Sequence, residues 1–398
     1  MDVIEQEIHV TFRYPVHFTT GLFAASNRLL RDLVGAAEGG AARVVAVIDR
    51  GVQRAHPGLT DAITSYVAHH HDRMALAAPV LVLPGGEQVK NDPDHVTQVL
   101  DAIHAGALCR HSYLIAVGGG AVLDVAGFAA ATAHRGVRLI RVPTTVLAQD
   151  DSAVGVKNGV NAYGKKNYLG TFAPPFAVVN DFSFLTTLSD RDWVGGLTEA
   201  VKVALIRDAS LFDFLEAHAA ALLDRDPAAM EQVIRRSAVL HLRHIATSGD
   251  PFEQGSSRPL DFGHWAAHKL EQVTQHRMRH GEAVGIGIAL DSTYAHLAGF
   301  LPEPEWRRIT GLIMALGLSV YSPALSERLD TPADPSCVLR GLAEFQEHLG
   351  GRLTIMLLRG IGVPFDVNEI RTDVMIRSIE MLKTIEAGRA DTPRTKAS

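Results

Sequence analysis

The sequence predicts an α/β protein, with a doubly wound parallel sheet in its amino-terminal half and a mostly α-helical second domain. Hydrophobic residues make up 47% of the 398 residues, and 35 are glycine, which is typical of a packed α/β protein. Short Val/Ile/Leu runs alternate with helical stretches up to about residue 180, and longer helical patterns follow. A chain of this length can bury two cores. We therefore expect one domain over residues 1–180 and a second over 181–398.

Five apolar runs that end in turn residues predict the strands of the sheet. They are "ARVVAVID", "PVLVLPGGE", "SYLIAVGGG", "RLIRVPTT" and "FAVVND". Such runs are typical of parallel strands that are buried on both faces. The stretches "DPDHVTQVLDAIHAGAL" and "AVLDVAGFAAATAH" between them predict helices. In sheets of this kind ligands bind beyond the carboxyl ends of the strands, where these Gly-rich and acidic turns lie.

Composition argues against several classes of partner. The formal charge of −6, the pI near 6.3 and the lack of a long basic block predict no nucleic-acid binding. The acidic start "MDVIEQEIHV" and the absence of a long apolar run predict neither a signal peptide nor a membrane span. Cys109 and Cys337 are too few for a disulfide framework or a cysteine-based zinc site, which favours a cytoplasmic location.

The first candidate site is the glycine turn in "AVGGGAVLDVAG". A predicted strand runs into Gly118, Gly119 and Gly120, and a predicted helix follows directly. Backbone amides in such a turn can approach a pyrophosphate closely, although a purely structural tight turn would have the same residues. Asp49 ends another strand and could accept hydrogen bonds from a ribose, and "GGEQVK" ends a third. Together the three strand ends predict a nucleotide site.

The second candidate site is a basic, glycine-rich stretch, "HRGVRLIRVPTTVLAQDDSAVGVKNGVNAYGKKNYLGTF". It contains Arg135, Asp151, Lys157, Lys165, Lys166 and Asn167. Ammonium groups and backbone amides in glycine-rich loops can converge on a phosphate. A solvated basic loop is the alternative interpretation.

The third candidate site contains histidines. His264 and His268 in "DFGHWAAHKL" are four residues apart, so in a helix both imidazoles could share one metal ion. Because the chain has 19 histidines, a chance pair on a polar helix face is, from this spacing alone, the simpler explanation. Glu199, three residues before Lys202 in "GGLTEAVKVALI", is either part of an ion pair or a ligand. With His264 and His280 it would supply one carboxylate and two imidazoles, a set suited to catalytic zinc.

Several motifs jointly identify a family. In order they are "GGGAVLD", "HRGVRLIRVPTT", "DDSAVGVK", "GKKN", "LTEAVK", "FGHWAAH" and "HGEAV". With this order and spacing the chain resembles the sugar phosphate cyclases, the superfamily of 3-dehydroquinate synthase, over nearly all of residues 40–365. The pattern also resembles the EboD-type branch, which occurs in bacterial and algal gene clusters beside a prenyltransferase-like protein. The resemblance implies a Rossmann-like NAD-binding domain, a helical metal-binding domain, a homodimer, and tightly held NAD with Zn²⁺ or Co²⁺.

The resemblance also assigns roles to individual residues. It makes Glu199, His264 and His280 the metal ligands, and it gives His268 proton transfer instead of ligation. The cofactor contacts that it implies are Asp49, Glu87, Lys90, Gly119, Gly120, Asp124, Thr144, Thr145, Asp151, Lys157, Lys166 and Thr187. The substrate contacts that it implies are Lys157, Lys166, Asn167, Lys202, Arg243, Asp261, His268 and, from the neighbouring subunit, Arg135. The catalytic groups would be His268, Lys202, Asp151 and Lys157.

The implied reaction converts a seven-carbon sugar phosphate to a carbocycle with loss of phosphate. Oxidation of a carbinol acidifies the adjacent C–H so that phosphate can leave, the hydride is then returned, and ring opening and aldol closure follow. No net redox change results. The substrate would be 3-deoxy-arabino-heptulosonate 7-phosphate or sedoheptulose 7-phosphate.

Departures from the quinate-forming members bear on that choice of substrate. "GVKN" replaces "GGKT", Asp261 replaces an asparagine, Arg243 replaces a substrate lysine, and Ser257 followed by Arg258 stands where an arginine is expected. The carboxy-terminal lysine of those members has no clear counterpart. Asp261 would repel a substrate carboxylate and so favours sedoheptulose 7-phosphate, whereas Arg243 and Arg258 favour a carboxylate.

Two other functions remain as alternatives at this point. A metal-dependent polyol dehydrogenase would share the two-domain design, NAD and the metal, but it would need no phosphate site. A non-catalytic binding protein on the same fold would be expected to have lost ligands or cofactor residues. The intact basic cluster argues against the first, and the complete metal set and glycine turn argue against the second.

Overall fold

The chain forms two compact units in a computed structural model that describes residues 3–35, 40–253, 255 and 257–390. Unit 1 comprises Met1–Thr144 and Val156–Ser183, and unit 2 comprises Thr145–Gly155 and Phe184–Ser398. We expected a single crossing after residue 180. In the structure the chain enters unit 2 at Thr145, returns at Val156 and leaves unit 1 again after Ser183. The segment Thr145–Gly155 is therefore part of the mostly helical unit.

Unit 1 is built on a seven-stranded parallel sheet. Its strands are β1 (Val16–Thr19), β2 (Ala42–Asp49), β3 (Met74–Leu76), β4 (Leu81–Leu83), β5 (Tyr113–Gly118), β6 (Arg138–Pro143) and β9 (Ala177–Asp181). The order is β1-β9-β6-β5-β2-β3, with β4 also paired to β2. All of β5 and all but one residue of β2 are buried, as their unbroken apolar runs predict. The predicted parallel sheet is confirmed.

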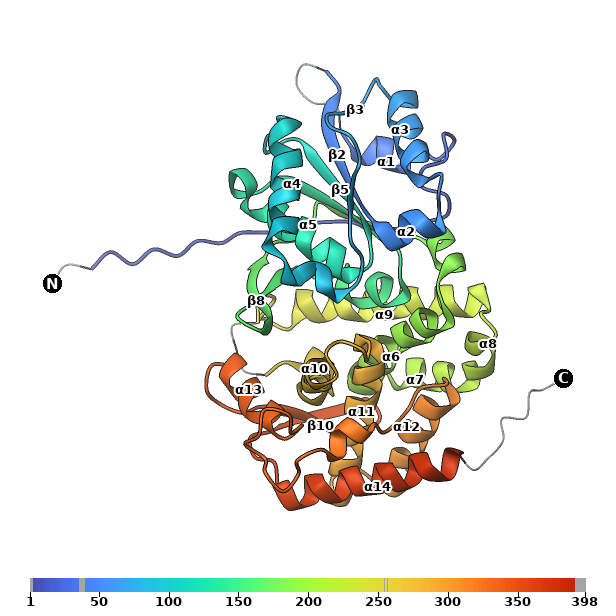
Figure 1. The fold of residues 1–398 in the computed structure, drawn as a ribbon, viewed down its shortest axis with the longest axis vertical. Coiled ribbons are helices and arrows are strands. Elements are labelled where there is room, and N and C mark those ends of the chain that lie inside the picture. The colour runs from blue at the N-terminus through green and yellow to red at the C-terminus, as the bar shows by residue number, and fades with distance from the viewer. Residues whose placement is uncertain (1–2, 36–39, 254, 256, 391–398) are drawn as a thin grey trace. The chain divides into compact units, whose positions relative to one another are not determined.

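Helices cover both faces of this sheet, α4 and α5 on one side and α1 to α3 on the other (Figure 1). They are α1 (Leu29–Leu33), α2 (Arg50–Ala55), α3 (Leu59–His69), α4 (Pro93–Ala105) and α5 (Gly120–Thr132). Asp92 caps α4 by accepting a hydrogen bond from the backbone N–H of Asp94 at 2.9 Å. The order of the strands reverses between β2 and β5. Asp49 and Gly118 therefore lie at the switch point where such sheets bind ligands.

The last part of the basic stretch forms an antiparallel hairpin of β7 (Lys157–Ala162) and β8 (Lys165–Phe172), where we expected mainly loop. Arg141 holds the start of β7 in place, because its Nη2 donates to Lys157 O at 2.9 Å and to Asn158 Oδ1 at 2.6 Å. Asn158 packs so closely on α5 that a Cβ at Gly127 would lie 1.8 Å from its Oδ1. The first strand is thus fixed to unit 1, whereas most of β8 is exposed.

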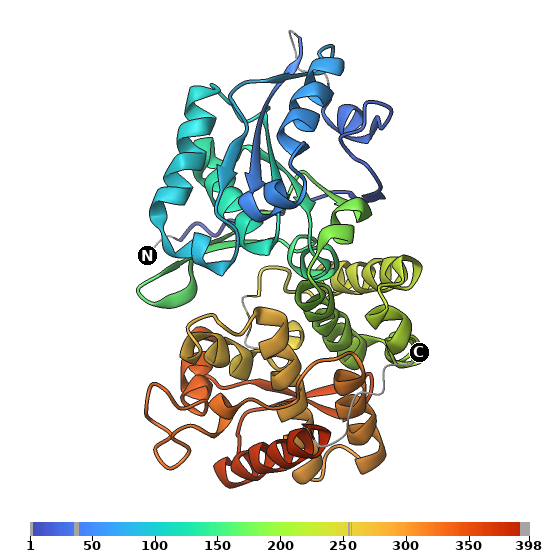
Figure 2. The same cartoon turned by 45° about the vertical axis from the view of Figure 1, so that its right-hand side comes forward.

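Unit 2 is mostly helical. Its longer elements are α6 (Asp190–Arg207), α7 (Ala209–Ala217), α8 (Ala219–Leu223), α9 (Pro227–Thr247), α10 (His264–Val273), α11 (His280–Leu297), α12 (Glu303–Ala315), α13 (Arg340–His348), α14 (Thr372–Ala390) and the hairpin β10 (Ile355–Gly360) and β11 (Val363–Val367). Unit 2 also contains a π-helical turn, Ala148–Ser152, and the short 3₁₀-helices Pro259–Asp261 and Pro323–Ser326. The 3₁₀-helices Glu87–Asn91 and Ala133–Arg135 belong to unit 1, and Phe182–Thr187 crosses the boundary after Ser183. Helix α11, largely buried, packs against α6, α10, α12 and α14 (Figure 2). Within the described ranges, no helix has the length and apolarity needed to cross a bilayer.

Candidate active site

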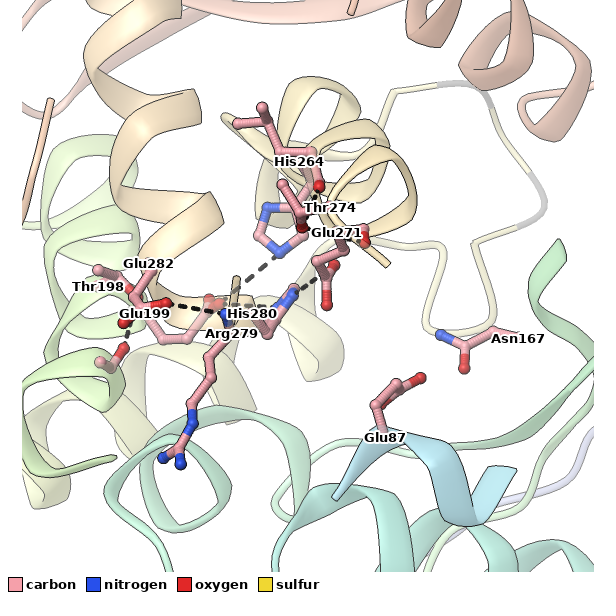
Figure 3. A network of polar contacts seen from close by, with 12 residues as sticks. Glu87, Asn167, Thr198, Glu199, His264, Glu271, Thr274, Arg279, His280 and Glu282 are labelled. Carbon is pink, nitrogen blue, oxygen red and sulfur yellow. Dashed lines mark hydrogen bonds and ion pairs between the residues drawn. The ribbon is translucent and has the colours of Figure 1, made fainter. Parts of the chain in front are cut away.

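Three side chains in unit 2 form a triangle that can hold a metal ion. Glu199 comes from α6, and His264 and His280 are the first residues of α10 and α11. Figure 3 shows both imidazoles turned toward the Glu199 carboxylate. Glu199 Oε1 lies 3.7 Å from His264 Nε2 and 3.4 Å from His280 Nε2. Both distances exceed an ordinary hydrogen bond, and they match the separation of about 3.3 Å that tetrahedral ligands with metal bonds near 2.0–2.1 Å would have.

The other ring nitrogen of each histidine is occupied. His264 Nδ1 lies 3.1 Å from Phe262 O, and His280 Nδ1 lies 3.1 Å from Glu271 Oε2. If these nitrogens donate to the two acceptors, each Nε2 is left with a lone pair that faces Glu199. A second shell of this kind orients imidazole ligands in metal sites.

His268 lies beside the triangle. Its ring centroid is 5.5 Å from that of His264 and 6.1 Å from that of His280. It also forms a second possible metal-binding group with Glu271 and His280, which shares His280 with the first. The hydrogen bond from His280 Nδ1 to Glu271 in the second group, and the turn of His280 Nε2 toward Glu199, favour the first group.

Close backbone contacts between helices set the size of the triangle. A Cβ at Gly281 would lie 2.0 Å from Gly195 O, so α11 approaches α6 next to His280. A Cβ at Gly287 would lie 2.0 Å from Gly263 O, so α10 approaches the same helix next to His264. Gly263 has φ +78°, a conformation that glycine adopts without strain. The helices can approach this closely only because Gly281 and Gly287 have no side chains.

A buried acid, Asp291, anchors the start of α10. Its Oδ2 accepts from the backbone N–H of Gly263 at 3.1 Å, and its Oδ1 accepts from Trp265 Nε1 at 2.8 Å. Asp291 is therefore hydrogen-bonded to the residues directly before and after His264. Burial raises the pKa of Asp291 to about 7, against the opposing effect of these two hydrogen bonds.

A buried lysine controls the charge of the site. Lys202 Nζ lies 2.5 Å from Glu199 Oε2 and 3.5 Å from Asp151 Oδ1. Burial alone would raise the pKa of Glu199, but the Lys202 ammonium, His280 and His264 together outweigh burial and hold this pKa at about 2. Burial alone would likewise lower the pKa of Lys202, and the carboxylates of Asp151 and Glu199 raise it. Burial and Lys202 lower the pKa of His264. Near neutral pH the site thus presents an anionic carboxylate and a neutral imidazole, the states that bind metals.

The π-helical turn brings two adjacent acids to this site in opposite states. Burial alone would raise the pKa of Asp151, but Lys202 and His241 together hold it well below the ordinary value. Burial and the Asp151 carboxylate raise the pKa of Asp150 well above its ordinary value. Neither oxygen of Asp150 has a hydrogen-bond partner among the described residues. No sequence pattern singles out Asp150.

His241 is a second residue that the sequence analysis missed. Its Nδ1 lies 2.7 Å from Asp151 Oδ1. We expected Arg243, two residues later on α9, to contact the substrate, but Arg243 is exposed. The buried stripe of this helix runs through Ile234, Ala238 and His241. That helical period could have shown that position 241 faces inward and position 243 outward.

Asp261 and Arg258 lie on the segment before α10. Asp261 ends the 3₁₀-helix Pro259–Asp261, and its charge helps to raise the pKa of Lys202. Arg258 Nη2 donates to Glu253 O at 3.3 Å, and Ser257 Oγ donates to Asp366 Oδ2 at 2.5 Å. The negative charge of Asp261 therefore acts on Lys202 and His264 in the candidate site.

In unit 1, four predicted residues share one polar network. Lys90, which is buried, donates to Asp124 Oδ2 at 2.7 Å and to Asn167 Oδ1, and its Nζ lies 3.6 Å from Glu87 Oε1. The backbone N–H of Asn167 donates to Asn161 Oδ1 at 2.8 Å. We expected Glu87, Lys90 and Asp124 at the cofactor and Asn167 at the substrate. The network joins these positions within one unit.

The glycine turn and Asp49 also lie together at the switch point. Asp49 accepts a hydrogen bond from the backbone N–H of Gly51 at 2.6 Å and another from Gly119. A Cβ at Gly85 would lie 2.4 Å from its Oδ1. Burial raises the pKa of Asp49, against these hydrogen bonds. The carboxylate therefore joins the start of α2 to the glycine turn, and Gly85 leaves room for it, a role that the ribose interpretation did not include.

The structure places the remaining predicted residues as follows. Gly120 begins α5, Thr144 is buried after β6, and Thr145 is half-buried. Lys157 is exposed and Lys166 half-buried on the hairpin, and Thr187 is exposed, with its Oγ1 3.3 Å from Phe184 O. Arg135 is exposed, with φ +61°.

Two family models match the chain. The model described as 3-dehydroquinate synthase N-terminal covers residues 80–195, and the model described as 3-dehydroquinate synthase C-terminal covers residues 196–332. The 3-dehydroquinate synthase of Jannaschia sp. is 35% identical over 306 residues, which are 76% of this chain and 81% of that protein. The 2-epi-5-epi-valiolone synthase of Streptomyces glaucescens is 35% identical over 351 residues, which are 88% of this chain and 85% of that protein.

Solved structures show the same relationship. The 2-epi-5-epi-valiolone synthase ValA of Streptomyces hygroscopicus subsp. jinggangensis 5008, with NAD⁺ and Zn²⁺ bound, aligns with a TM-score of 0.84 and 31% identity, over 96% of this chain and all of that one. A glycerol dehydrogenase of Schizosaccharomyces pombe shares the fold alone, with a TM-score of 0.61 and 14% identity over 98% of this chain and 95% of that one. On this evidence the chain belongs to the 3-dehydroquinate synthase family of sugar phosphate cyclases, which are lyases that act on phosphates.

Proposed function

We propose that this protein cyclises a seven-carbon sugar phosphate and eliminates phosphate, with NAD used catalytically and Zn²⁺ or Co²⁺ as the metal. The observation that carries the proposal is the triangle of Glu199, His264 and His280, with both Nε2 atoms turned toward one carboxylate oxygen. One carboxylate and two imidazoles leave a coordination position for substrate. When bound, NAD accepts and returns a hydride, and the metal polarises the oxygen on the reacting carbon.

The residues around the triangle supply the proton chemistry. We infer that His268, which is half-buried and stacked against His280, moves protons near neutral pH. Lys202 keeps Glu199 and Asp151 ionised, and Asp151 in turn orients His241. We infer that Lys202 and Asp151 contact the substrate from this buried array.

The hairpin of unit 1 is suited to the phosphate. Lys157, Lys166 and Asn167 lie on its two strands, and Arg141 fixes the first of them at Lys157 O. The network of Lys90 and Asp124 connects Asn167 to α5, which the glycine turn precedes. We infer that NAD lies at the switch point beside that turn, with Thr144 and Thr145 as further contacts. A polyol dehydrogenase would need no such basic hairpin.

Sedoheptulose 7-phosphate is the substrate that we favour. The charge of Asp261 reaches Lys202 and His264, so a substrate carboxylate there would meet a negative field. Arg258 already contacts Glu253, and Arg243 is exposed on α9.

A pair of parallel assays tests the proposal. Purified protein with NAD and Zn²⁺ or Co²⁺ would receive sedoheptulose 7-phosphate or 3-deoxy-arabino-heptulosonate 7-phosphate, and released phosphate would be measured. We expect phosphate and a carbocycle from the first, with no accumulation of NADH. Release from the second alone would reverse the substrate assignment. If neither releases phosphate while metal and NAD are both bound, the seven-carbon class is wrong. Stoichiometric NADH from a simple polyol would establish a dehydrogenase.

We further infer a cytoplasmic homodimer. Both cysteines are free thiols, and Cys109 is exposed, which suits a reducing compartment. Arg135 projects from a turn in which His134, Arg135 and Gly136 all have positive φ. A strained, exposed turn of this kind is consistent with a role for Arg135 in a neighbouring subunit's site. Sedimentation analysis would test the dimer, and a monomer at assay concentrations would contradict it.

A further inference from the structure

A row of buried polar side chains leads away from the metal triangle within unit 2. Lys202 Nζ lies 2.5 Å from Glu199 Oε2 and 3.5 Å from Asp151 Oδ1. Asp151 Oδ1 in turn lies 2.7 Å from His241 Nδ1. The row is formed by the π-helical turn, α6 and α9, which pack against one another. His241 is therefore at the opposite end of this row from the ligand Glu199.

The two ring nitrogens of His241 have different surroundings. Because Asp151 is ionised, its oxygen only accepts hydrogen bonds, so Nδ1 of His241 is the donor. In the neutral ring Nε2 then carries a lone pair. This nitrogen has no hydrogen-bond partner among the described residues, although the side chain is only 10% exposed. An imidazole that is oriented by a carboxylate and has its second nitrogen open has the arrangement of a general base.

Gly155 leaves space beside the open nitrogen. A Cβ at Gly155 would lie 3.4 Å from His241 Nε2. The φ angle of Gly155 lies outside the left-handed region, so the backbone there does not require glycine. The missing side chain therefore matters for the space next to Nε2, where a methyl group would take the place of a hydroxyl at hydrogen-bond distance.

The chemistry of the proposed reaction separates two ends of the sugar ring. The carbinol that is oxidised is adjacent to the C–H that must be acidified before phosphate leaves. In the six-membered hemiketal ring of sedoheptulose 7-phosphate, this carbinol carbon and the hemiketal carbon lie opposite one another. When the carbinol binds at the triangle, the hemiketal hydroxyl therefore points away from the metal ligands. A group that acts on this hydroxyl is needed at the other end of the row.

We propose that His241 is a catalytic residue that opens the sugar ring through Nε2, and this assignment rests on the proposed function. Nε2 takes the proton of the hemiketal hydroxyl as a C=O bond forms at that carbon and its bond to the ring oxygen breaks. The proton then passes from Nε2 to the released oxygen, so no atom is lost and no carbon changes its oxidation state. The imidazolium that exists between these two transfers lies beside the Asp151 carboxylate, which stabilises it.

An asparagine at position 241 tests the role of Nε2. The amide of His241→Asn can still donate to Asp151 from about the position of Nδ1, but it has no group that exchanges a proton at the position of Nε2. Excess enzyme with NAD and Zn²⁺ would be mixed with sedoheptulose 7-phosphate and quenched at short times, and phosphate and carbocycle would be measured in the same samples. Because ring opening follows elimination, phosphate release should stay within about threefold of wild type while carbocycle formation slows by about 10²–10⁴-fold.

His244→Asn is the matched control. His244 lies on the same helix, and its Nδ1 is 2.6 Å from Arg207 Nη2, so both products should form at wild-type rates. All three proteins should contain one metal per chain. Equal slowing of both products in His241→Asn, no slowing of either, or loss of its metal would overturn the ring-opening role. Absence of phosphate release by wild type would instead contradict the proposed function itself.

A second pair of variants tests access to Nε2 without changing His241. Gly155→Ala places a methyl group 3.4 Å from Nε2 and should slow carbocycle formation at least about tenfold relative to phosphate release. Gly311→Ala on α12 adds a methyl group with no atom listed within 4 Å and should leave both rates unchanged. If carbocycle forms equally fast in the two variants, the substrate does not reach Nε2 and the proposal is wrong.

Discussion

The two clusters of predicted site residues are built in different ways. In unit 2, Glu199, His264 and His280 come from three helices whose backbones are in direct contact. In unit 1, Lys166 and Asn167 lie on β8, a largely exposed strand that pairs with β7 alone among the strands of the described ranges. A metal site tolerates errors of a few tenths of an ångström at most, whereas a flexible phosphate ligand can be met by mobile lysines. Changes in unit 2 should therefore remove function outright, and changes in unit 1 should adjust affinity.

The largest expected effect separates the two histidines of α10. His264→Ala should lose nearly all bound metal, because it removes one of the three proposed ligands. His268→Ala should keep one metal per chain and lose turnover by about 10²–10⁴-fold, the usual contribution of a general acid or base. Elemental analysis and phosphate release on the same samples give both readouts. Full metal occupancy in His264→Ala would reject the assignment of the triangle.

Asp291 should produce the next largest effect, in the pH dependence of stability. The pKa of Asp291 is about 7 in the folded state and lower in the unfolded state, so the folded state holds the carboxyl proton more tightly. Protonated Asp291 therefore stabilises the fold fully below about pH 4, and this stabilisation is lost as the pH rises through 7. The free energy of unfolding should fall by up to about 4 kcal/mol over that range. Asp291→Asn should remove this fall. We would compare urea unfolding of both proteins from pH 4 to 8, and parallel curves would contradict the raised pKa.

A smaller effect compares two lysines of unit 1. Lys90 is 3% exposed and neutralises Asp124 and Glu87, so Lys90→Met should cost about 2–3 kcal/mol of unfolding free energy. Lys157→Met, at an exposed position, should change stability by less than about 0.5 kcal/mol and should raise KM. Urea titrations and steady-state kinetics test the pair. If Lys157→Met lost as much unfolding free energy as Lys90→Met, Lys157 would be part of the packed structure and the hairpin would be more rigid than we infer.

The smallest expected effect concerns two indole hydrogen bonds on α11. Asp291 accepts from Trp265 Nε1 at 2.8 Å, and Thr293 accepts from Trp306 Nε1 at 2.9 Å. Asp291→Ala and Thr293→Val should each cost about 1–3 kcal/mol. Metal affinity, measured by chelator competition, should fall about tenfold only in Asp291→Ala, because only this residue holds the neighbours of His264. Equal affinities in the two variants would show that Asp291 is merely structural.

Local patterns predicted most of the fold. The five strands with unbroken apolar runs and the two helices between them are present, since such segments are buried on defined faces. The short strands β1 and β3 were not predicted, because four or three residues at a sheet edge have little periodicity. Nor did any local signal show that Thr145–Gly155 would join unit 2.

The candidate site was predicted unevenly. Motif order indicated Glu199, His264 and His280, and the structure brings them together. His241 contacts Asp151, which lies 90 residues earlier in the chain, so spacing could not reveal the pair. Asp150 has an unusual state only because of burial beside Asp151. The contact of Gly287 with Gly263 O depends on tertiary packing, which no single-sequence pattern contains.

The glycine contacts also affect how mutational data on this protein should be interpreted. In a saturation scan, Gly281 and Gly287 should be as intolerant of substitution as the ligands, although neither has a functional group. An analysis that ranks positions by lost activity would classify both as catalytic. Substitutions of the proposed ligands alone, made to change the metal preference, would leave the distances between α6, α10 and α11 unchanged. Those distances depend on the backbone contacts at Gly281 and Gly287.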